Sequence, residues 1–202
     1  MPRRTAAIAV GVATAAVTAV GLSFLRVGKP LVIVSAAVVG VAGVAVSARR
    51  EGEENDANAY IKSGNAKYEI GDYQGSIEDF SKALIINPQY ALAYYNRGNA
   101  KDELEDYKGA IDDYSKALEI DARHAVAYNN RGVANRKSGD NRAAIADYNK
   151  ALEIDSQLAV AYLNRGISKE NDGNLTGACA DWREASALGD EIAAKWVKES
   201  CR

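Results

Sequence analysis

The sequence holds few side chains of the kinds that catalyse reactions or bind metal ions. It contains one histidine, His124, and two cysteines, Cys179 and Cys201. Alone, these three side chains cannot build a common zinc site or a thiol–imidazole centre. Adjacent carboxylates such as those of Asp112 and Asp113 are better explained as a solvated helix surface than as an acid–base pair. We therefore expect neither enzymatic activity nor a metal or other cofactor.

The two cysteines leave one question of redox state open. A single disulfide between Cys179 and Cys201 is possible in an oxidising compartment. The dense cysteine framework of a small secreted domain is absent, because the chain contains no other cysteine. The sequence does not decide whether the two residues pair.

Three other sets of polar residues recur at a fixed interval of 34 positions. Regularly spaced charges of opposite sign indicate structural ion pairs rather than a ligand site. Recurring asparagines are different, because a side-chain amide offers a donor and an acceptor together and can hold the backbone of an extended peptide. The recurring residues are Arg97, Arg131 and Arg165; Asp79, Asp113, Asp147 and Asp181; and Asn96, Asn130 and Asn164.

The interval reflects four copies of one unit, which we number repeats 1–4: residues 57–90, 91–124, 125–158 and 159–192. Repeats 1 and 2 are identical at 18 of 34 positions, as are repeats 2 and 3. Each contains two amphipathic stretches separated by a helix-breaking pair such as Gly71-Asp72, in which glycine ends one helix and aspartate caps the next. A new unit begins at residue 193 and stops, so residues 193–202 are expected to form a capping helix.

Residues between the repeats also have helix-capping chemistry. We expect Asn87, Asp121, Asp155 and Asp190 to cap the helix that follows each of them, with Pro88 at a first helical position.

The repeats resemble the tetratricopeptide repeat family, in a style common in cyanobacterial and other bacterial proteins. Each has aromatic residues at positions 4 and 24, small residues at positions 8 and 20, and alanine at position 27. In repeat 2 these are Tyr94, Tyr114, Gly98, Ala110 and Ala117. The resemblance implies an all-α fold: a right-handed superhelical solenoid of four helix pairs plus the capping helix. It also implies a concave groove that is lined by the first helix of each pair and binds protein or peptide partners.

The groove implied by the resemblance contains an asparagine ladder at position 6, flanked by apolar residues that suit a peptide with hydrophobic anchors. A clamp for an acidic C-terminal tail would need Lys or Arg at positions 2, 5 or 6, where only Lys62 occurs. Two alternatives stay open: the asparagines could be a packing signature, and some aliphatic residues could pack between repeats. The groove residues are Leu92, Tyr95, Asn96, Asn99, Val126, Asn129, Asn130, Val133, Val160, Leu163, Asn164 and Ile167.

The recurring charges predict ion pairs between neighbouring repeats. Arginine occupies position 7 in repeats 2–4, whereas repeat 1, which has no preceding repeat, has Ser63 there. This difference favours pairs that cross from one repeat to the next. We therefore predict Asp79–Arg97, Asp113–Arg131 and Asp147–Arg165, in preference to pairs within one repeat.

The first fifty residues differ from the repeats in charge and hydropathy. They carry six of the 25 basic residues and none of the 27 acidic ones, so residues 51–202 have a net charge of 19 − 27 = −8. An acidic body of this kind repels nucleic acid. Residues 5–25 and 31–48 are uncharged, and at about 1.5 Å per residue each run is long enough for a helix to cross a bilayer. We expect a hairpin membrane anchor over residues 1–50, joined to the repeats by an acidic linker over 51–56.

Other interpretations of the N-terminus remain open. The first apolar run could be a cleaved secretory or twin-arginine signal, or both runs could be buried helices of a soluble domain. Four basic residues at the outer ends of the hairpin against two in its loop favour repeats on the cytoplasmic or stromal side of an inner, plasma or thylakoid membrane.

These observations imply a membrane-anchored interaction scaffold, which could assist the assembly of a membrane complex. The alternative is an exported envelope or lumenal repeat protein with a cleaved or single-span N-terminus. The sequence decides neither the identity of the partner nor whether the chain forms homo-oligomers.

Overall fold

A computed structural model describes residues 55–201 of the chain. All regular secondary structure within these residues is helical. No helix among them combines the length and the apolar composition needed to cross a bilayer. The expected membrane segments at 5–25 and 31–48 lie outside the described residues, as does most of the expected linker.

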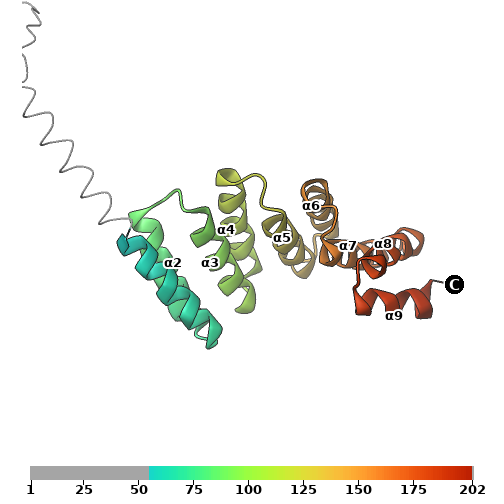
Figure 1. Cartoon of the computed structure of the whole chain (residues 1–202), viewed down its shortest axis with the longest axis horizontal. Helices are drawn as coiled ribbons and strands as arrows, with labels where there is room; N and C mark the ends of the chain where they lie inside the picture. Colours follow the sequence, from blue (N-terminus) through green and yellow to red (C-terminus); the bar gives the residue numbers. More distant parts are fainter. Residues whose placement is uncertain (1–54, 202) are drawn as a thin grey trace, which may run out of the picture. The chain divides into compact units, whose positions relative to one another are not determined.

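The helices follow one another as packed pairs (Figure 1). The first described helix covers residues 55–69 and pairs with α2, so that each repeat contributes two helices, and α9 follows repeat 4. This arrangement confirms the all-α solenoid of helix pairs. The labelled helices are α2 (Tyr73–Ile86), α3 (Ala91–Glu103), α4 (Tyr107–Ile120), α5 (Ala125–Lys137), α6 (Asn141–Ile154), α7 (Ala159–Asn171), α8 (Leu175–Ala187) and α9 (Glu191–Ser200).

The turn inside each repeat has the predicted chemistry. The side chains of Asp72, Asp106, Asp140 and Asn174 each accept a hydrogen bond from the backbone N–H three residues later, at 2.9–3.0 Å. In repeats 1, 3 and 4 a glycine with positive φ precedes this cap, as at Gly139 (φ 96°). Repeat 2 differs, because Glu105 takes the same left-handed conformation with φ 60°. Only glycine adopts that conformation without a steric cost.

The prediction for the turns between repeats was wrong at three of four positions. Asn87, Asp121 and Asp155 each accept a hydrogen bond from the backbone N–H two residues later. They form tight local turns, and the next helix begins four residues after each of them, beyond the reach of the side chain. Pro88 accordingly lies in a turn rather than in a helix. Only Asp190 caps the following helix as expected, by accepting from the N–H of Ala193 at 2.8 Å.

The two helices of a repeat approach closely where a glycine faces an aromatic ring. A Cβ atom added to Gly132 would lie 2.7 Å from the ring of Tyr148, and one added to Gly98 would lie 2.8 Å from the ring of Tyr114. Such distances are too short for any Cβ atom, so glycine is required at position 8. The aromatic residues at position 24 are thereby almost completely buried and form the centre of each repeat.

The C-terminal end of the array is covered by α9. The indole of Trp196 on α9 packs edge-on against Trp182 of α8, with 5.1 Å between ring centroids. Cys179 of α8 is disulfide-bonded to Cys201, which follows α9, so a covalent link holds this helix against repeat 4. The structure thus pairs the two cysteines whose pairing the sequence left undecided.

Candidate functional site

The first helices of successive repeats form the inner side of the array. Helices α3 and α5 contact each other directly, as do α5 and α7, in addition to their contacts with neighbours in sequence. The second helices α2, α4, α6 and α8 make no comparable contacts with one another. Because the first helices converge while the second helices spread apart, the concave surface belongs to the first helices.

A row of exposed aliphatic side chains runs across this inner surface. Leu92, Val126 and Val160 occupy position 2 of α3, α5 and α7, and each exposes 41–43% of its surface. Their common register places them on the same side of consecutive helices. We call these three residues the apolar row.

The asparagine ladder links neighbouring repeats. The side-chain nitrogen of Asn96 donates to the oxygen of Asn65 in repeat 1 at 2.9 Å, and Asn164 donates to Asn129 at 3.1 Å. Asn130 donates to both Asn99 and the hydroxyl of Tyr95, each at 3.1 Å. Every ladder amide therefore uses donor capacity inside the array.

These bonds agree with the packing interpretation of the ladder and leave part of it open to a ligand. Among residues 55–201, the side-chain oxygens of Asn96 and Asn164 accept no hydrogen bond, whereas that of Asn130 accepts one from Asn129 at 3.1 Å. Asn96 and Asn164 are thus better placed than Asn130 to bind a peptide backbone.

Several predicted groove residues are not accessible on the inner surface. Asn129 is 4% exposed and Leu163 is 8% exposed. Leu163 belongs to the core around Trp182, and Ile167 packs against the same core. Position 5 is therefore largely a packing position, because it faces the partner helix and the neighbouring repeat rather than the groove.

Tyr95 and His124 form a contact that the sequence did not indicate. The two rings stack with 4.8 Å between centroids, and His124 Nδ1 also accepts a hydrogen bond from the N–H of Ala127 at 3.2 Å. His124 therefore both caps α5 and supports a groove residue. Its position at the end of repeat 2 gave no signal of this role in the sequence.

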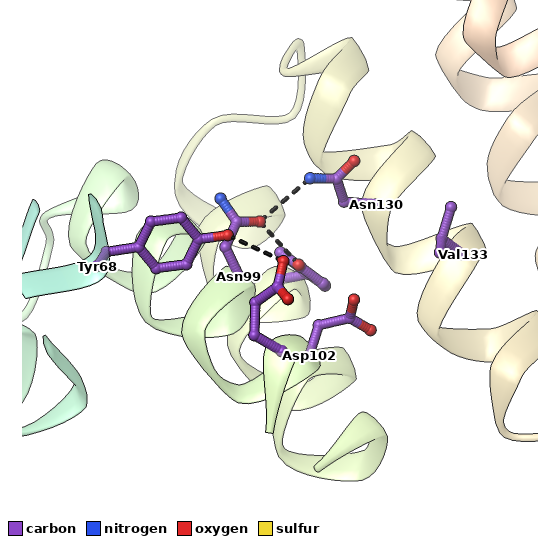
Figure 2. A pocket seen from close by; sticks show the side chains of 7 residues that line it. Tyr68, Asn99, Asp102, Asn130 and Val133 are labelled. Atoms are coloured by element: carbon purple, nitrogen blue, oxygen red, sulfur yellow. Dashed lines mark hydrogen bonds between the residues drawn. The ribbon is translucent and has the colours of Figure 1, made fainter. Parts of the chain in front are cut away.

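A polar pocket of about 190 Å³ opens between the first three repeats (Figure 2). Its centre is the side-chain oxygen of Asn99, which accepts from Tyr114 Oη at 2.8 Å and from Asn130 at 3.1 Å. Val133 and Asp102 also line it (Figure 2). Together with Tyr68 and Glu103, these residues line the pocket.

The pocket has an acidic character. The Tyr68 hydroxyl donates to Glu103 at 3.2 Å, and Lys137 pairs with one oxygen of Asp102 at 2.6 Å. Burial, reinforced by the charge of Glu103, raises the pKa of Tyr68 to about 12. Burial and the nearby Asp102 also raise the pKa of Tyr114. Both phenols therefore stay protonated and act as hydrogen-bond donors.

Sequence reasoning named Asn99, Asn130 and Val133 but missed the other lining residues. Tyr68, Asp102 and Glu103 stand at positions 12 and 13, which share a helical face with positions 2, 6 and 9. The sequence predicts that positions 12 and 13 lie on the groove face, but nothing in the pattern singled out these three side chains.

The arginine–aspartate pairs lie within repeats, so the predicted pairs Asp79–Arg97, Asp113–Arg131 and Asp147–Arg165 are wrong. Arg97 binds Asp113 through two nitrogens, at 2.7 and 2.8 Å. Arg131 binds Asp147 and Arg165 binds Asp181 in the same way. The long side chain at position 7 turns back along its own helix and reaches the second helix of the same repeat.

The third arginine nitrogen nevertheless reaches the preceding repeat. Nη1 of Arg97, Arg131 and Arg165 donates to position 25 of that repeat, where Ser81, Ser115 and Asn149 accept at 2.7–3.0 Å. This contact explains Ser63 in repeat 1, where no preceding repeat offers an acceptor.

In repeat 1, where Ser63 stands in the arginine position, three side chains surround Asp79. Ser63 donates to its carboxylate at 2.6 Å, and Lys67 and Lys82 lie 2.7 and 3.1 Å away. Burial alone would disfavour the charged carboxylate, but hydrogen bonds from Lys67, Ser63 and Lys82 outweigh burial and lower the pKa of Asp79 to about 2.

Comparison with known proteins agrees with this architecture. The family model described as tetratricopeptide repeat matches residues 91–124 and 125–158, and a second model, TPR repeat, matches residues 64–102. Together these matches identify tetratricopeptide repeats (TPRs) over residues 64–158. The TPR helix pair also recurs in residues 159–187, where α7 and α8 pack as α5 and α6 do. Among curated protein sequences, no match to this chain is found.

Solved TPR structures share the fold. The crystal structure of MamA is 26% identical, with a TM-score of 0.65 over 69% of this chain and 82% of MamA. The Arabidopsis OM64 TPR domain is 26% identical, with a TM-score of 0.58 over 59% of this chain and 98% of that domain. The first TPR of Spaghetti (RPAP3), bound to the HSP90 peptide SRMEEVD, is 22% identical, with a TM-score of 0.58 over 59% of this chain and 95% of that domain.

Proposed function

We propose that this protein is an interaction scaffold whose TPR array binds a partner peptide along α3, α5 and α7. The apolar row carries the proposal. Leu92, Val126 and Val160 remain more than 40% exposed at one register of three consecutive helices. Covering such a row with apolar peptide side chains removes hydrocarbon from water at about 25 cal/mol per Å². The Spaghetti domain, which has the same fold, is bound to a peptide.

The ladder supplies the polar part of this recognition. The free oxygens of Asn96 and Asn164 lie on the same helices as the apolar row and can accept backbone N–H groups of an extended peptide. The groove therefore combines hydrophobic anchoring with backbone recognition, as grooves that bind extended peptides generally do.

A charge substitution within the apolar row tests the proposal. Val126→Asp in the full chain, solubilised in detergent, should abolish co-purification of the partners captured by the wild type. Ile85→Asp is the matched control, because Ile85 is 80% exposed on α2, a second helix, and lies away from the groove. If both variants retain the same partners, the groove does not bind them.

We further propose that residues 5–48 anchor the array to a membrane, which would place partner binding at a membrane surface and could assist assembly of a membrane complex. Two uncharged runs separated by a basic loop support this proposal. Carbonate extraction of native membranes should leave the full-length chain in the pellet, and its release at full length would contradict an integral anchor.

The side of the membrane on which the repeats lie is a separate proposal with two candidates. The excess of basic residues at the outer ends of the hairpin supports a cytoplasmic or stromal position. The disulfide between Cys179 and Cys201 supports the alternative, an exported envelope or lumenal array, because disulfides persist in oxidising compartments.

Thiol labelling in intact cells separates these candidates. A membrane-permeant maleimide with a mass tag should modify both cysteines without reductant if the repeats face a reducing compartment. It should modify neither until a reductant is added if they face an oxidising one.

A further inference from the structure

We propose that the polar pocket between repeats 1, 2 and 3 binds one basic side chain, lysine or arginine, of the groove peptide. This inference rests on the proposed function and specifies the peptide that the groove recognises. The pocket lies beside the ladder residue Asn130, so a peptide that follows the ladder would pass its mouth (Figure 2).

The chemistry of the lining favours a cation with hydrogen-bond donors. Oδ1 of Asp102 is buried and accepts no hydrogen bond from any residue within 55–201. Glu103 is exposed, and the Tyr68 hydroxyl holds one of its oxygens in place. No lining residue is basic, and Lys137 pairs with only one of the two carboxylates, that of Asp102. A ligand that supplies a positive charge and N–H donors would pair with Glu103 and with the accessible part of the Asp102 carboxylate.

The remaining lining residues suit the stem of such a side chain. Tyr68 lines the pocket with an aromatic ring, against which a cation can lie. Val133 offers an aliphatic surface for methylene groups, and Asn99 is held in place by Tyr114 and Asn130. The volume of about 190 Å³ is sufficient for one long side chain. An anionic side chain would meet two carboxylates there.

The acidic pair is specific to one repeat and is therefore not part of the scaffold. Asp102 and Glu103 stand at positions 12 and 13 of repeat 2, whereas the same positions of repeat 3 are Arg136 and Lys137. Groups needed for packing recur along the array, as the arginine–aspartate pairs of repeats 2–4 do. Because the charge at these positions reverses from repeat 2 to repeat 3, the groove can bind a peptide in one orientation only, with a basic peptide residue at repeat 2.

Phage display of random dodecapeptides on the immobilised full chain tests the inference. The wild type should enrich peptides with Lys or Arg at one fixed distance from aliphatic residues. Glu103→Gln should lose this enrichment, whereas Asp112→Asn should retain it. Both variants remove one acidic charge from repeat 2, but Asp112 is exposed on α4 and does not line the pocket.

Affinities of one selected peptide complete the test. Replacing its basic residue with glutamine should weaken binding to the wild type by about tenfold, and to Glu103→Gln by only about twofold, as expected when a charged partner is already removed. Enriched peptides without a basic preference, or an equal preference on Glu103→Gln, would overturn the inference while leaving the groove intact. If the wild type enriches no peptide beyond the Val126→Asp variant, both the inference and the proposed function fail.

Discussion

Replacing Arg131 with methionine should lower the free energy of unfolding by about 3 kcal/mol, because the substitution leaves a buried carboxylate short of a partner. Arg131 donates to Asp147 through Nε at 3.0 Å and Nη2 at 2.6 Å, and Asp147 is only 6% exposed. Asn135 still donates to that carboxylate at 2.9 Å. This remaining bond places the loss at the lower end of the range of about 3–5 kcal/mol for breaking a buried pair.

A double-mutant cycle with Asp147→Asn isolates the pair. The second substitution removes the buried charge, so the double variant should be more stable than Arg131→Met alone. The coupling energy should be about 2 kcal/mol, in the range measured for residues in direct contact. The same cycle with Asp113, the partner predicted from sequence, should give less than about 0.5 kcal/mol. Urea unfolding followed by far-UV circular dichroism supplies all the free energies.

Two outcomes would refute the reasoning. Stronger coupling of Arg131 to Asp113 than to Asp147 would mean that the ion pairs cross between repeats after all. A loss below about 1 kcal/mol for Arg131→Met would mean that Asp147 is hydrated or otherwise satisfied.

Three further predictions concern other elements of the array. Glu105→Gly should raise the free energy of unfolding by about 1 kcal/mol, because the left-handed conformation of Glu105 costs about 1–2 kcal/mol. Gly139→Glu should lower the free energy of unfolding by a similar amount in the same urea titration. Asp79 has a pKa lowered to about 2, so its contribution to stability is present above about pH 4 and lost as the pH falls toward 2. Asp79→Asn should therefore flatten the dependence of the unfolding free energy on pH between about pH 4 and 2, measured by urea unfolding. The double substitution Cys179→Ser and Cys201→Ser opens a covalent loop of 22 residues and should destabilise the C-terminal end of the array by about 3 kcal/mol. Hydrogen exchange in α8 and α9 should then become faster. Unchanged exchange would contradict a cap that is held by the disulfide.

Local sequence determines the repeated architecture of this protein. Each helix pair follows from amphipathic periodicity within one repeat, and the turn in three of the four repeats from a glycine followed by a capping residue such as Asp72 or Asp140. The small residue at position 8 and the aromatic at position 24 also meet inside one repeat, as Gly132 and Tyr148 show. This contact recurs in all four repeats, so the residues that make it form a visible pattern in the sequence.

Tertiary structure decided which partner each long polar side chain takes. Position 7 determined that Arg131 lies near two repeats, but the direction of its side chain selected Asp147 over Asp113. The same holds at position 5, where Asn129 is buried, and at position 12, where Asp102 reaches a pocket built from three repeats. The pairing of Cys179 with Cys201 likewise depends on how α9 docks on α8. Sequence spacing places a residue on a helical face, whereas the choice among partners a few ångströms apart depends on how neighbouring helices pack.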